Sequence, residues 1–295
     1  MGTVSTRSGR GLAITESTVP HPGRSLPDPA FIRSLTARLR AAGCVFAEEE
    51  ARLLADAAAS AGQLDALAAR RAAGEPLEHV LGWAEFCGLR IAVDPGVFVP
   101  RRRTEFLVQQ AAFLLRESGQ PSNAARGLRP PVVVDLCCGS GAVGAALACL
   151  AGPAELHASD IDPAAVRCAR RNLLRLGGEV YQGDLYSPLP ERLRGQVQVL
   201  AVNAPYVPSA GIRTMPREAR LHEPLVSLDG GADGLDVQRR VAAEAPQWLA
   251  PGGHLLVETS LLQAPSTVDL FMRNGLTARV ASSEELDATV VIGRA

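Results

Sequence analysis

From Pro131 onward, short apolar runs alternate with longer amphipathic segments, and this alternation restricts the fold more than any other feature of the sequence. The runs expected as strands are 132–136, 155–162, 179–185, 197–203, 253–260, 277–283 and 288–293. The segments expected as helices are 142–150, 163–176, 238–249 and 266–275. Parallel strands that are buried on both faces appear as short continuous apolar runs, with helices covering the sheet between them. The sequence therefore predicts an α/β fold with a doubly wound, Rossmann-like sheet.

Length and composition exclude several classes of protein. The 295 residues suffice for one large or two modest domains, and 47% hydrophobic with 21% charged residues is ordinary for a globular protein. No apolar stretch approaches the roughly 20 residues that a membrane helix needs. A formal net charge of −1 gives no electrostatic basis for binding nucleic acid or an acidic membrane. Six cysteines without a Cys-x-x-Cys pair indicate free thiols in a reducing cytoplasm and no metal site.

The chain divides into four segments by composition. Residues 1–27 are rich in Ser, Thr, Gly, Pro and Arg and are expected to be a disordered leader. Residues 28–82 are expected to form a small N-terminal helical domain that is rich in Ala and Leu. Residues 83–130 are expected to hold a β-hairpin and a linker helix, and residues 131–295 the sheet domain.

The helical domain and the linker carry local signals. Asp28 is expected to cap a first helix that Gly43 ends, and two more helices are expected over 46–60 and 64–74.

In the linker, 89–93 and 97–99 are expected to pair around a turn at 94–96. Thr104 is then expected to cap a helix through Leu115, ahead of a polar loop.

A glycine-rich loop follows the first strand of the sheet domain. Residues 139–144 read Gly-Ser-Gly-Ala-Val-Gly, and glycines at such a turn let the backbone pass under a ligand without Cβ clashes. Asp160 follows Gly141 at about the distance expected of an acid that binds ribose hydroxyls. This pattern alone fits both nicotinamide dinucleotides and S-adenosylmethionine (SAM).

Two features favour SAM. The first is Asp135, which precedes the glycine loop. A carboxylate there suits the cationic amino-acid end of SAM, whereas a pyrophosphate prefers bare amides at a helix N-terminus. Asp162 is the better helix cap before Pro163, which leaves Asp160 for the ribose. Asp184, also at a strand end, is expected to contact the adenine in preference to a turn role.

The second feature is the exit of the strand 197–203, which reads Asn203-Ala204-Pro205-Tyr206. A methyl acceptor that is a planar NH2 group needs two hydrogen-bond acceptors aimed at its two N–H bonds. The Asn203 side-chain carbonyl and the Ala204 backbone carbonyl can supply them. Pro205 stiffens the turn, and Tyr206 can cover the flat face of the acceptor or lie near the sulfonium. We therefore expect Asn203, Pro205 and Tyr206 to act in catalysis by positioning.

The ordered set of motifs resembles the bacterial protein N5-glutamine methyltransferases that modify peptide chain release factors. The resemblance runs from about residue 75 to residue 263. The motifs that carry it are EPLEHVLG, FCGLRIAVDPGVFVPRRRTEFLV, DLCCGSGAVGAALA, SDIDPAAVRCARRN, GDLY, NAPYVP, HEPLVSLDGGADGL and ETSLLQ.

The resemblance implies a function and roles for particular residues. It implies a SAM-dependent methyltransferase of the cytoplasm that methylates a glutamine amide, in the Gly-Gly-Gln loop of a release factor, in translation termination. The helical domain would grip this protein substrate, and a monomer without metal is expected. Residues 203–206 would hold the glutamine amide, and Leu185 would flank the adenine. The other residues expected to contact SAM are Asp135, Cys137, Cys138, Gly139, Ser140, Gly141, Asp160, Asp184 and Asn203.

The chain also departs from the usual family pattern. Ala204 replaces a proline, Cys137 replaces a glycine, and Arg102 and Arg103 stand where a proline and an acid are usual. A cysteine in the left-handed region of the backbone would be strained.

Four alternative functions remain open from the sequence. They are a ribosomal-protein glutamine methyltransferase, a nucleic-acid amino-methyltransferase acting on adenine N6 or guanine N2, an inactive SAM-binding paralogue, and an oxidoreductase. The nucleic-acid enzyme would need a basic cleft and a stacking aromatic, against 4% aromatic residues here. The oxidoreductase is the weakest, because it gives residues 203–206 no role.

Overall fold

The computed structural model describes residues 29–118 and 129–295, so the predicted leader, the Asp28 cap and most of the predicted polar loop lie outside the described residues. The N-terminal helices are α1 (Pro29–Ala41), α2 (Ala47–Ala57), α3 (Ala61–Ala72) and α4 (Leu77–Leu81). Leu39, Leu54 and Ala68 are fully buried where the first three pack together. The three predicted helices are confirmed, and Gly43 ends the first with a left-handed backbone. The fourth was not predicted.

The β-hairpin exists but lies elsewhere than predicted. Its strands are β1 (Trp83–Phe86) and β2 (Leu89–Ala92), which pair antiparallel around Cys87 and Gly88. Both turn residues have positive φ, as the tight turns that match strand twist require. The expected pairing of 89–93 with 97–99 is wrong, because the segment that pairs with β2 is β1. The turn at 94–96 does form, but it carries 97–99 into the core instead of back along β2.

The central sheet has seven strands in the order β5-β4-β3-β6-β7-β9-β8. Five are parallel, and β9 runs antiparallel to both of its neighbours. The strands are β3 (Val132–Leu136), β4 (Glu155–Asp160), β5 (Glu179–Gln182), β6 (Val197–Val202), β7 (Leu249–Thr259), β8 (Thr277–Ser283) and β9 (Ala288–Arg294). The strands predicted for this domain are confirmed.

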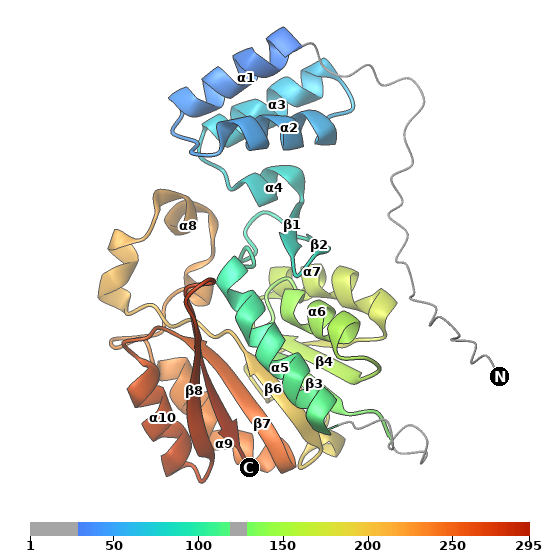
Figure 1. Ribbon diagram of the computed structural model, residues 1–295, viewed down its shortest axis with the longest axis vertical. Helices are drawn as coiled ribbons and strands as arrows, with labels where there is room; N and C mark the ends of the chain where they lie inside the picture. The colour runs from blue at the N-terminus through green and yellow to red at the C-terminus, as the bar shows by residue number, and fades with distance from the viewer. Residues whose placement is uncertain (1–28, 119–128) are drawn as a thin grey trace, which may run out of the picture.

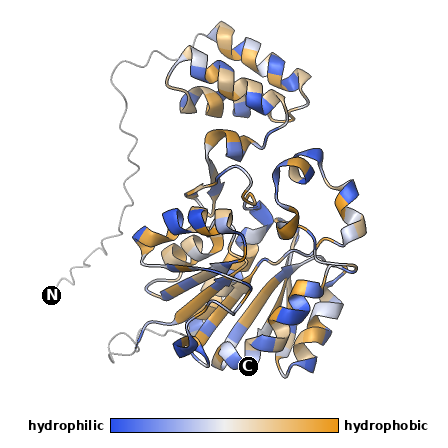
Figure 2. Cartoon of the chain, turned by 180° about the vertical axis from the view of Figure 1, so that it is seen from behind, coloured by the Kyte–Doolittle hydropathy of each residue, from blue (hydrophilic) through white to orange (hydrophobic). Residues whose placement is uncertain are grey.

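Helices cover both faces of the sheet, which makes three layers (Figure 1). One face packs against α5 (Glu105–Ser118), α6 (Ala142–Leu150) and α7 (Pro163–Leu173), and the other against α9 (Asp236–Trp248) and α10 (Ala264–Arg273). Figure 2 shows apolar residues along the strands between these layers. The doubly wound α/β prediction is therefore confirmed. No helix in the described ranges has the length and apolar character to cross a bilayer.

Short helical turns complete the fold, and most were not predicted. They are η1 (Arg102–Thr104), η3 (Leu174–Leu176), η4 (Glu191–Leu193), η5 (Ser209–Thr214), α8 (Arg217–His222) and η6 (Leu225–Ser227). The segment holding η5, α8 and η6 rises from the sheet toward the N-terminal helices (Figure 1). Arg71 of α3 pairs with Glu218 of α8 at 3.3 Å, and with Glu50 of α2 at 2.6 Å. The N-terminal helices thus contact the segment that follows β6.

Candidate active site

The centre of the sheet brings the two predicted loops together. Strands β3 and β6 are parallel neighbours, with Leu136 opposite Val202. The segments 137–141 and 203–206 therefore leave the sheet side by side, where the strand order reverses direction and α/β proteins bind ligands. A cavity of about 320 Å³ opens there, within the range of small-molecule sites of roughly 300–1,000 Å³.

Nearly all the predicted site residues line this cavity. The lining includes Asp135, Cys137, Cys138, Gly139, Ser140, Asp160, Asp184, Leu185, Asn203, Ala204, Pro205 and Tyr206. Gly141 is the exception. A Cβ on Gly141 would lie 3.1 Å from side-chain atoms of Ala169 and Leu173, so this glycine permits the close approach of α7. The roles given to individual residues remain predictions.

The glycine loop has the left-handed backbone that its composition requires. The φ angles of Cys137, Gly139 and Gly141 are 56°, 55° and 77°. Cys137 therefore has the left-handed backbone in which a cysteine is strained, and a glycine would adopt it without cost. Burial raises the pKa of the Cys137 and Cys138 thiols, so both remain neutral near neutral pH. Among the described residues, no cluster of His, Cys, Asp and Glu is arranged to hold a metal.

Asp160 ties the glycine loop to the end of β4. Its Oδ2 accepts a hydrogen bond from the Gly139 backbone N–H at 2.8 Å, and its Oδ1 accepts one from Asp162 at 2.9 Å. Each oxygen keeps a further lone pair for a ligand hydroxyl. Burial raises the pKa of Asp160, and these backbone donors oppose the rise. Asp162 caps α7 by accepting from Ala164, as predicted.

Acidic groups gather at the cofactor end of the cavity. Asp135 is 1% exposed and accepts from the Gly144 N–H at 2.9 Å. Burial, with a smaller contribution from the charge of Asp160, raises the pKa of Asp135 to about 7, although the Gly144 hydrogen bond opposes the rise. Asp184 pairs with Arg240 at 2.6 Å, so its charge is partly neutralised. Buried carboxylates fit an ammonium group and ribose hydroxyls and repel a pyrophosphate, so this donor set fits SAM.

At the other end of the cavity lies the acceptor loop, residues 203–206. Ala204 and Pro205 are buried, and the Asn203 Nδ2 donates to the Thr104 Oγ1 at 3.2 Å. The Tyr206 hydroxyl donates to the Glu258 Oε1 at 3.3 Å. Burial, together with the nearby Glu258 charge, raises the pKa of Tyr206 to about 12. Tyr206 therefore stays protonated and can act as an aromatic wall and a hydrogen-bond donor, but not as a base.

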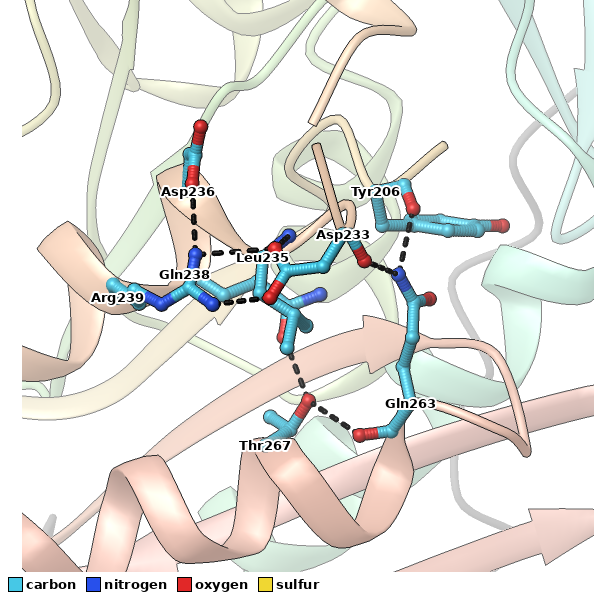
Figure 3. A network of polar contacts seen from close by, with 8 residues as sticks. All are labelled: Tyr206, Asp233, Leu235, Asp236, Gln238, Arg239, Gln263 and Thr267. Carbon is cyan, nitrogen blue, oxygen red and sulfur yellow. Dashed lines mark hydrogen bonds and ion pairs between the residues drawn. The ribbon is translucent and has the colours of Figure 1, made fainter. Parts of the chain in front are cut away.

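The acceptor loop is held from behind by a second network (Figure 3). The Gln263 Nε2 donates to the backbone carbonyls of Tyr206 at 2.9 Å and Asp233 at 3.0 Å. A Cβ on Gly234 would lie 2.3 Å from the Tyr206 carbonyl oxygen, and one on Gly230 would lie 2.7 Å from the Pro205 carbonyl oxygen. Only glycine permits this approach, so the loop conformation depends on contacts from distant parts of the chain.

Sequence reasoning missed several residues that line or support the site. Phe86, Phe98, Arg103 and Thr104 line the cavity, and Glu258 lies outside the lining, where it contacts the Tyr206 hydroxyl. The Thr104 hydroxyl, expected to cap a helix, instead accepts from Asn203, and α5 begins at Glu105. The available signal was the run of three Arg in PRRRTEF, because positive charges are unfavourable at the start of a helix.

Comparisons with known proteins agree with this geometry. The methyltransferase small domain family matches residues 91–215. A release factor glutamine methyltransferase of Geobacter sulfurreducens is 39% identical over 71% of this chain and 69% of its own. The one of Streptomyces coelicolor is 36% identical over 74% of this chain and 75% of its own. A 4-amino-L-phenylalanine/4-methylamino-L-phenylalanine methyltransferase of Streptomyces pristinaespiralis is 37% identical over 72% of this chain and 70% of its own.

Among solved structures, a methyltransferase from Pyrococcus furiosus superimposes with a TM-score of 0.50 and 16% identity, over 77% of this chain and 96% of that one. This likeness shows the fold alone. The sequence matches, together with the cavity at the β3–β6 junction, establish that the chain belongs to the release factor glutamine methyltransferase family and is a SAM-dependent methyltransferase.

Proposed function

We propose that the protein methylates the N5 amide nitrogen of a glutamine in a peptide chain release factor, in the Gly-Gly-Gln loop. The observation that carries the proposal is the acceptor loop, whose Asn203 and Ala204 lie in the same cavity as the carboxylates of the cofactor end. The family relatives named release factor glutamine methyltransferase support the substrate. As part of this proposal, the enzyme acts in the cytoplasm as a monomer.

The chemistry follows from the geometry of a primary amide. SAM supplies a methyl group on a positively charged sulfur. The Asn203 Oδ1 and the Ala204 carbonyl would accept the two N–H bonds of the glutamine amide and aim its nitrogen along the line of transfer. The lone pair of that nitrogen would form a bond to the methyl carbon as the carbon–sulfur bond breaks, with S-adenosylhomocysteine as the neutral leaving group, and the nitrogen would then lose one proton to water. Positioning replaces a general base here, because the acidity of the amide nitrogen increases sharply once it is methylated.

Exposed apolar side chains beside the cavity support a protein substrate. Leu221, Leu225 and Val226 are 60%, 59% and 51% exposed in the segment after β6, and Val226 also lines the cavity. The contact between Arg71 and Glu218 places the N-terminal helices beside this segment. A release factor loop entering the cavity would therefore meet both the segment after β6 and the helices, in line with the predicted role of residues 28–82.

A labelling experiment tests the proposal. The enzyme, SAM with a radiolabelled methyl group and a purified release factor are incubated, and the labelled peptide is mapped. We expect one methyl group on the glutamine of the Gly-Gly-Gln loop. A release factor carrying alanine at that glutamine is the control and takes up no label. Label on another residue, or on ribosomal proteins only, would overturn the proposed substrate.

One observation favours a second candidate, an aromatic amine on a free amino acid. Arg103 lines the cavity and is hydrogen-bonded to the Tyr206 hydroxyl, and none of the ion pairs among the described residues includes it. Its charge acts on Tyr206 and Glu258, so it lies near the acceptor loop. A guanidinium there would bind the carboxylate of a small substrate, and the Streptomyces pristinaespiralis relative is named for such an amino acid. Competition between the release factor and 4-amino-L-phenylalanine in one reaction discriminates the two.

A further inference from the structure

We propose that Asn172 is a positioning residue for the cofactor, because it holds the glycine loop against the end of the β-hairpin. Asn172 lies in the last turn of α7 and is not one of the residues that line the cavity. Its effect on SAM passes through Ser140, which does line the cavity. The inference concerns cofactor binding, so it holds whichever acceptor the enzyme methylates.

The side-chain amide of Asn172 pairs with the end of β2 as a neighbouring strand would. The Ala92 N–H donates to the Asn172 Oδ1 at 2.9 Å, and the Asn172 Nδ2 donates to the Ala92 carbonyl at 2.9 Å. Figure 1 shows α7 beside the hairpin that contains β2. One side chain therefore satisfies both backbone groups of Ala92 and fixes the hairpin to the helix that borders the glycine loop.

The NH2 group of Asn172 also holds the glycine loop. The Asn172 Nδ2 donates a second hydrogen bond, at 2.8 Å, to the Ser140 carbonyl. An amide NH2 group has two hydrogens, and here each of them has a carbonyl acceptor. The reversed amide would set its oxygen against two carbonyl oxygens and its NH2 group against the Ala92 N–H. The partners therefore fix the rotation of the amide.

The bond to Ser140 completes the set of contacts that fixes the loop. The Gly139 N–H is bound by the carboxylate at the end of β4, and the Gly141 N–H donates to the Cys138 carbonyl at 2.7 Å. The Ser140 carbonyl and the Gly141 N–H belong to one planar peptide group, so Asn172 and Cys138 hold this group from its two sides. Ser140 is 3% exposed, so water has little access to replace a lost donor. Without Asn172, the carbonyl would lose its partner and the peptide group could rotate.

Two other contacts join α7 to the end of the hairpin without touching the glycine loop. The Cys168 thiol donates to the Ala92 carbonyl at 3.1 Å, and Arg171 pairs with Asp94 at 2.6 Å. Removing the Arg171 side chain loosens the hairpin on α7 and leaves the bond to Ser140 in place. Arg171→Ala therefore separates the anchoring of the hairpin from the positioning of the loop.

A purely structural role for Asn172 would give a different result. If Asn172 only stabilised the fold, its loss would lower the melting temperature and leave the folded protein with wild-type affinity for the cofactor. A positioning role lowers the affinity of the folded protein itself, because the glycine loop then spends less time in the conformation that binds.

The experiment compares Asn172→Ala and Asn172→Asp with Arg171→Ala and Asn274→Ala in the full chain. Asn172→Asp keeps an acceptor for the hairpin N–H, but an ionised aspartate has no hydrogen for Ser140. Asn274 is the matched control, because it is also half-buried at the C-terminal end of a helix, α10, and its Nδ2 donates to a backbone carbonyl of that helix at 2.8 Å. Calorimetric titration with S-adenosylhomocysteine measures affinity, and thermal unfolding measures stability.

We expect both Asn172 variants to bind S-adenosylhomocysteine about tenfold or more weakly than wild type, since each leaves the Ser140 carbonyl without its donor. Arg171→Ala and Asn274→Ala should bind within about twofold of wild type. Wild-type affinity of folded Asn172→Asp, or an equal loss in Arg171→Ala, would overturn the proposal.

Nuclear magnetic resonance of the wild-type chain keeps the test independent of whether the variants fold. Titration with S-adenosylhomocysteine should shift the side-chain NH2 resonances of Asn172, although this side chain lies outside the cavity lining, and should leave those of Asn274 unchanged. Unchanged Asn172 resonances at saturation would contradict the inference. Neither measurement needs a methyl acceptor, so failure of the enzyme to methylate glutamine would count against the proposed function alone.

Discussion

Replacing Asp160 with asparagine tests the cofactor end of the site most directly. The two carboxylate oxygens accept backbone N–H bonds from Gly139 and Asp162, so both sides of the group face donors. An asparagine amide can accept on one side only, and its NH2 group meets an N–H on the other. One backbone donor loses its partner, which costs about 1–3 kcal/mol of folding free energy. A domain of this size loses roughly 2–4 °C of melting temperature per kcal/mol.

Cofactor affinity should fall as well, for a separate reason. Hydrogen bonds from ribose hydroxyls to a carboxylate are charge-assisted and contribute about 1.5–3 kcal/mol. At about 1.4 kcal/mol per factor of ten, the loss of that charge corresponds to roughly ten- to 150-fold weaker binding. The displaced glycine loop adds to the loss, because Gly139 lines the cavity.

Calorimetric titration with S-adenosylhomocysteine measures this loss. The matched control is Asp94→Asn, which removes an exposed ion pair with Arg171 outside the cavity and should leave affinity unchanged. Affinity of Asp160→Asn within about twofold of wild type would refute the ribose assignment. Binding of NAD as tight as that of S-adenosylhomocysteine would refute the cofactor assignment as a whole.

Four further predictions concern other parts of the site. Burial raises the pKa of Asp135 to about 7, and a cationic ligand favours its ionised form, so S-adenosylhomocysteine should bind more tightly as pH rises from about 6 to 8. Calorimetry should show no such trend for Asp135→Asn. Ala204→Pro should preserve or raise turnover on a glutamine peptide by pre-ordering the loop, and a fall would mean that the true acceptor needs the looser loop. Gly234→Ala, whose Cβ would meet a carbonyl of the acceptor loop at 2.3 Å, should lower turnover more than cofactor affinity, while Gly177→Ala, with similar φ and open space, should not. A chain of residues 82–295 should bind S-adenosylhomocysteine but lose more activity on the intact release factor than on a short glutamine peptide. Equal losses on the two substrates would show that the N-terminal helices do not recognise the release factor.

The truncated chain starts at residue 82, and not near Pro100, because of the hairpin. If the hairpin were only a linker, a chain starting near Pro100 would still contain the complete cofactor domain. In the structure, Phe86, Ile91 and Val99 are buried against α5 and the sheet, and Phe86 also lines the cavity. Removing them would disrupt the core, so loss of function there would say nothing about the helical segment.

Local patterns were enough to predict most of the sheet. Apolar runs, helical periodicity and the glycine loop involve neighbours in sequence, so strands β3 to β9 and the cofactor end could be predicted. The position of Asp162 as a cap was likewise a local matter. The hairpin was misplaced because two turns compete within a dozen residues, and the Cys87 backbone at φ 51° carries no signal in its residue type.

The acceptor end could be located but not explained from the sequence. Asn203 is anchored by Thr104, which lies 99 residues earlier, and Tyr206 is held by Gln263, which lies 57 residues later. Such pairings depend on which strand ends meet at one edge of the sheet. Arg71 and Glu218 are likewise joined only by the folded arrangement. A single sequence contains these residues without indicating that they touch.

The order of the strands also separates the two halves of the reaction along the chain. Most groups expected to contact the cofactor lie at the ends of β3, β4 and β5. The acceptor loop follows β6, and most of its contacts come from β7 and later or from the segment between β6 and α9, with Thr104 of η1 as an exception. Substitutions that change the methyl acceptor can therefore accumulate on one side of the β3–β6 junction while the cofactor side is conserved. This arrangement gives a route by which gene duplication and drift produce enzymes with new acceptors on one scaffold, as relatives named for a protein and for an amino acid illustrate.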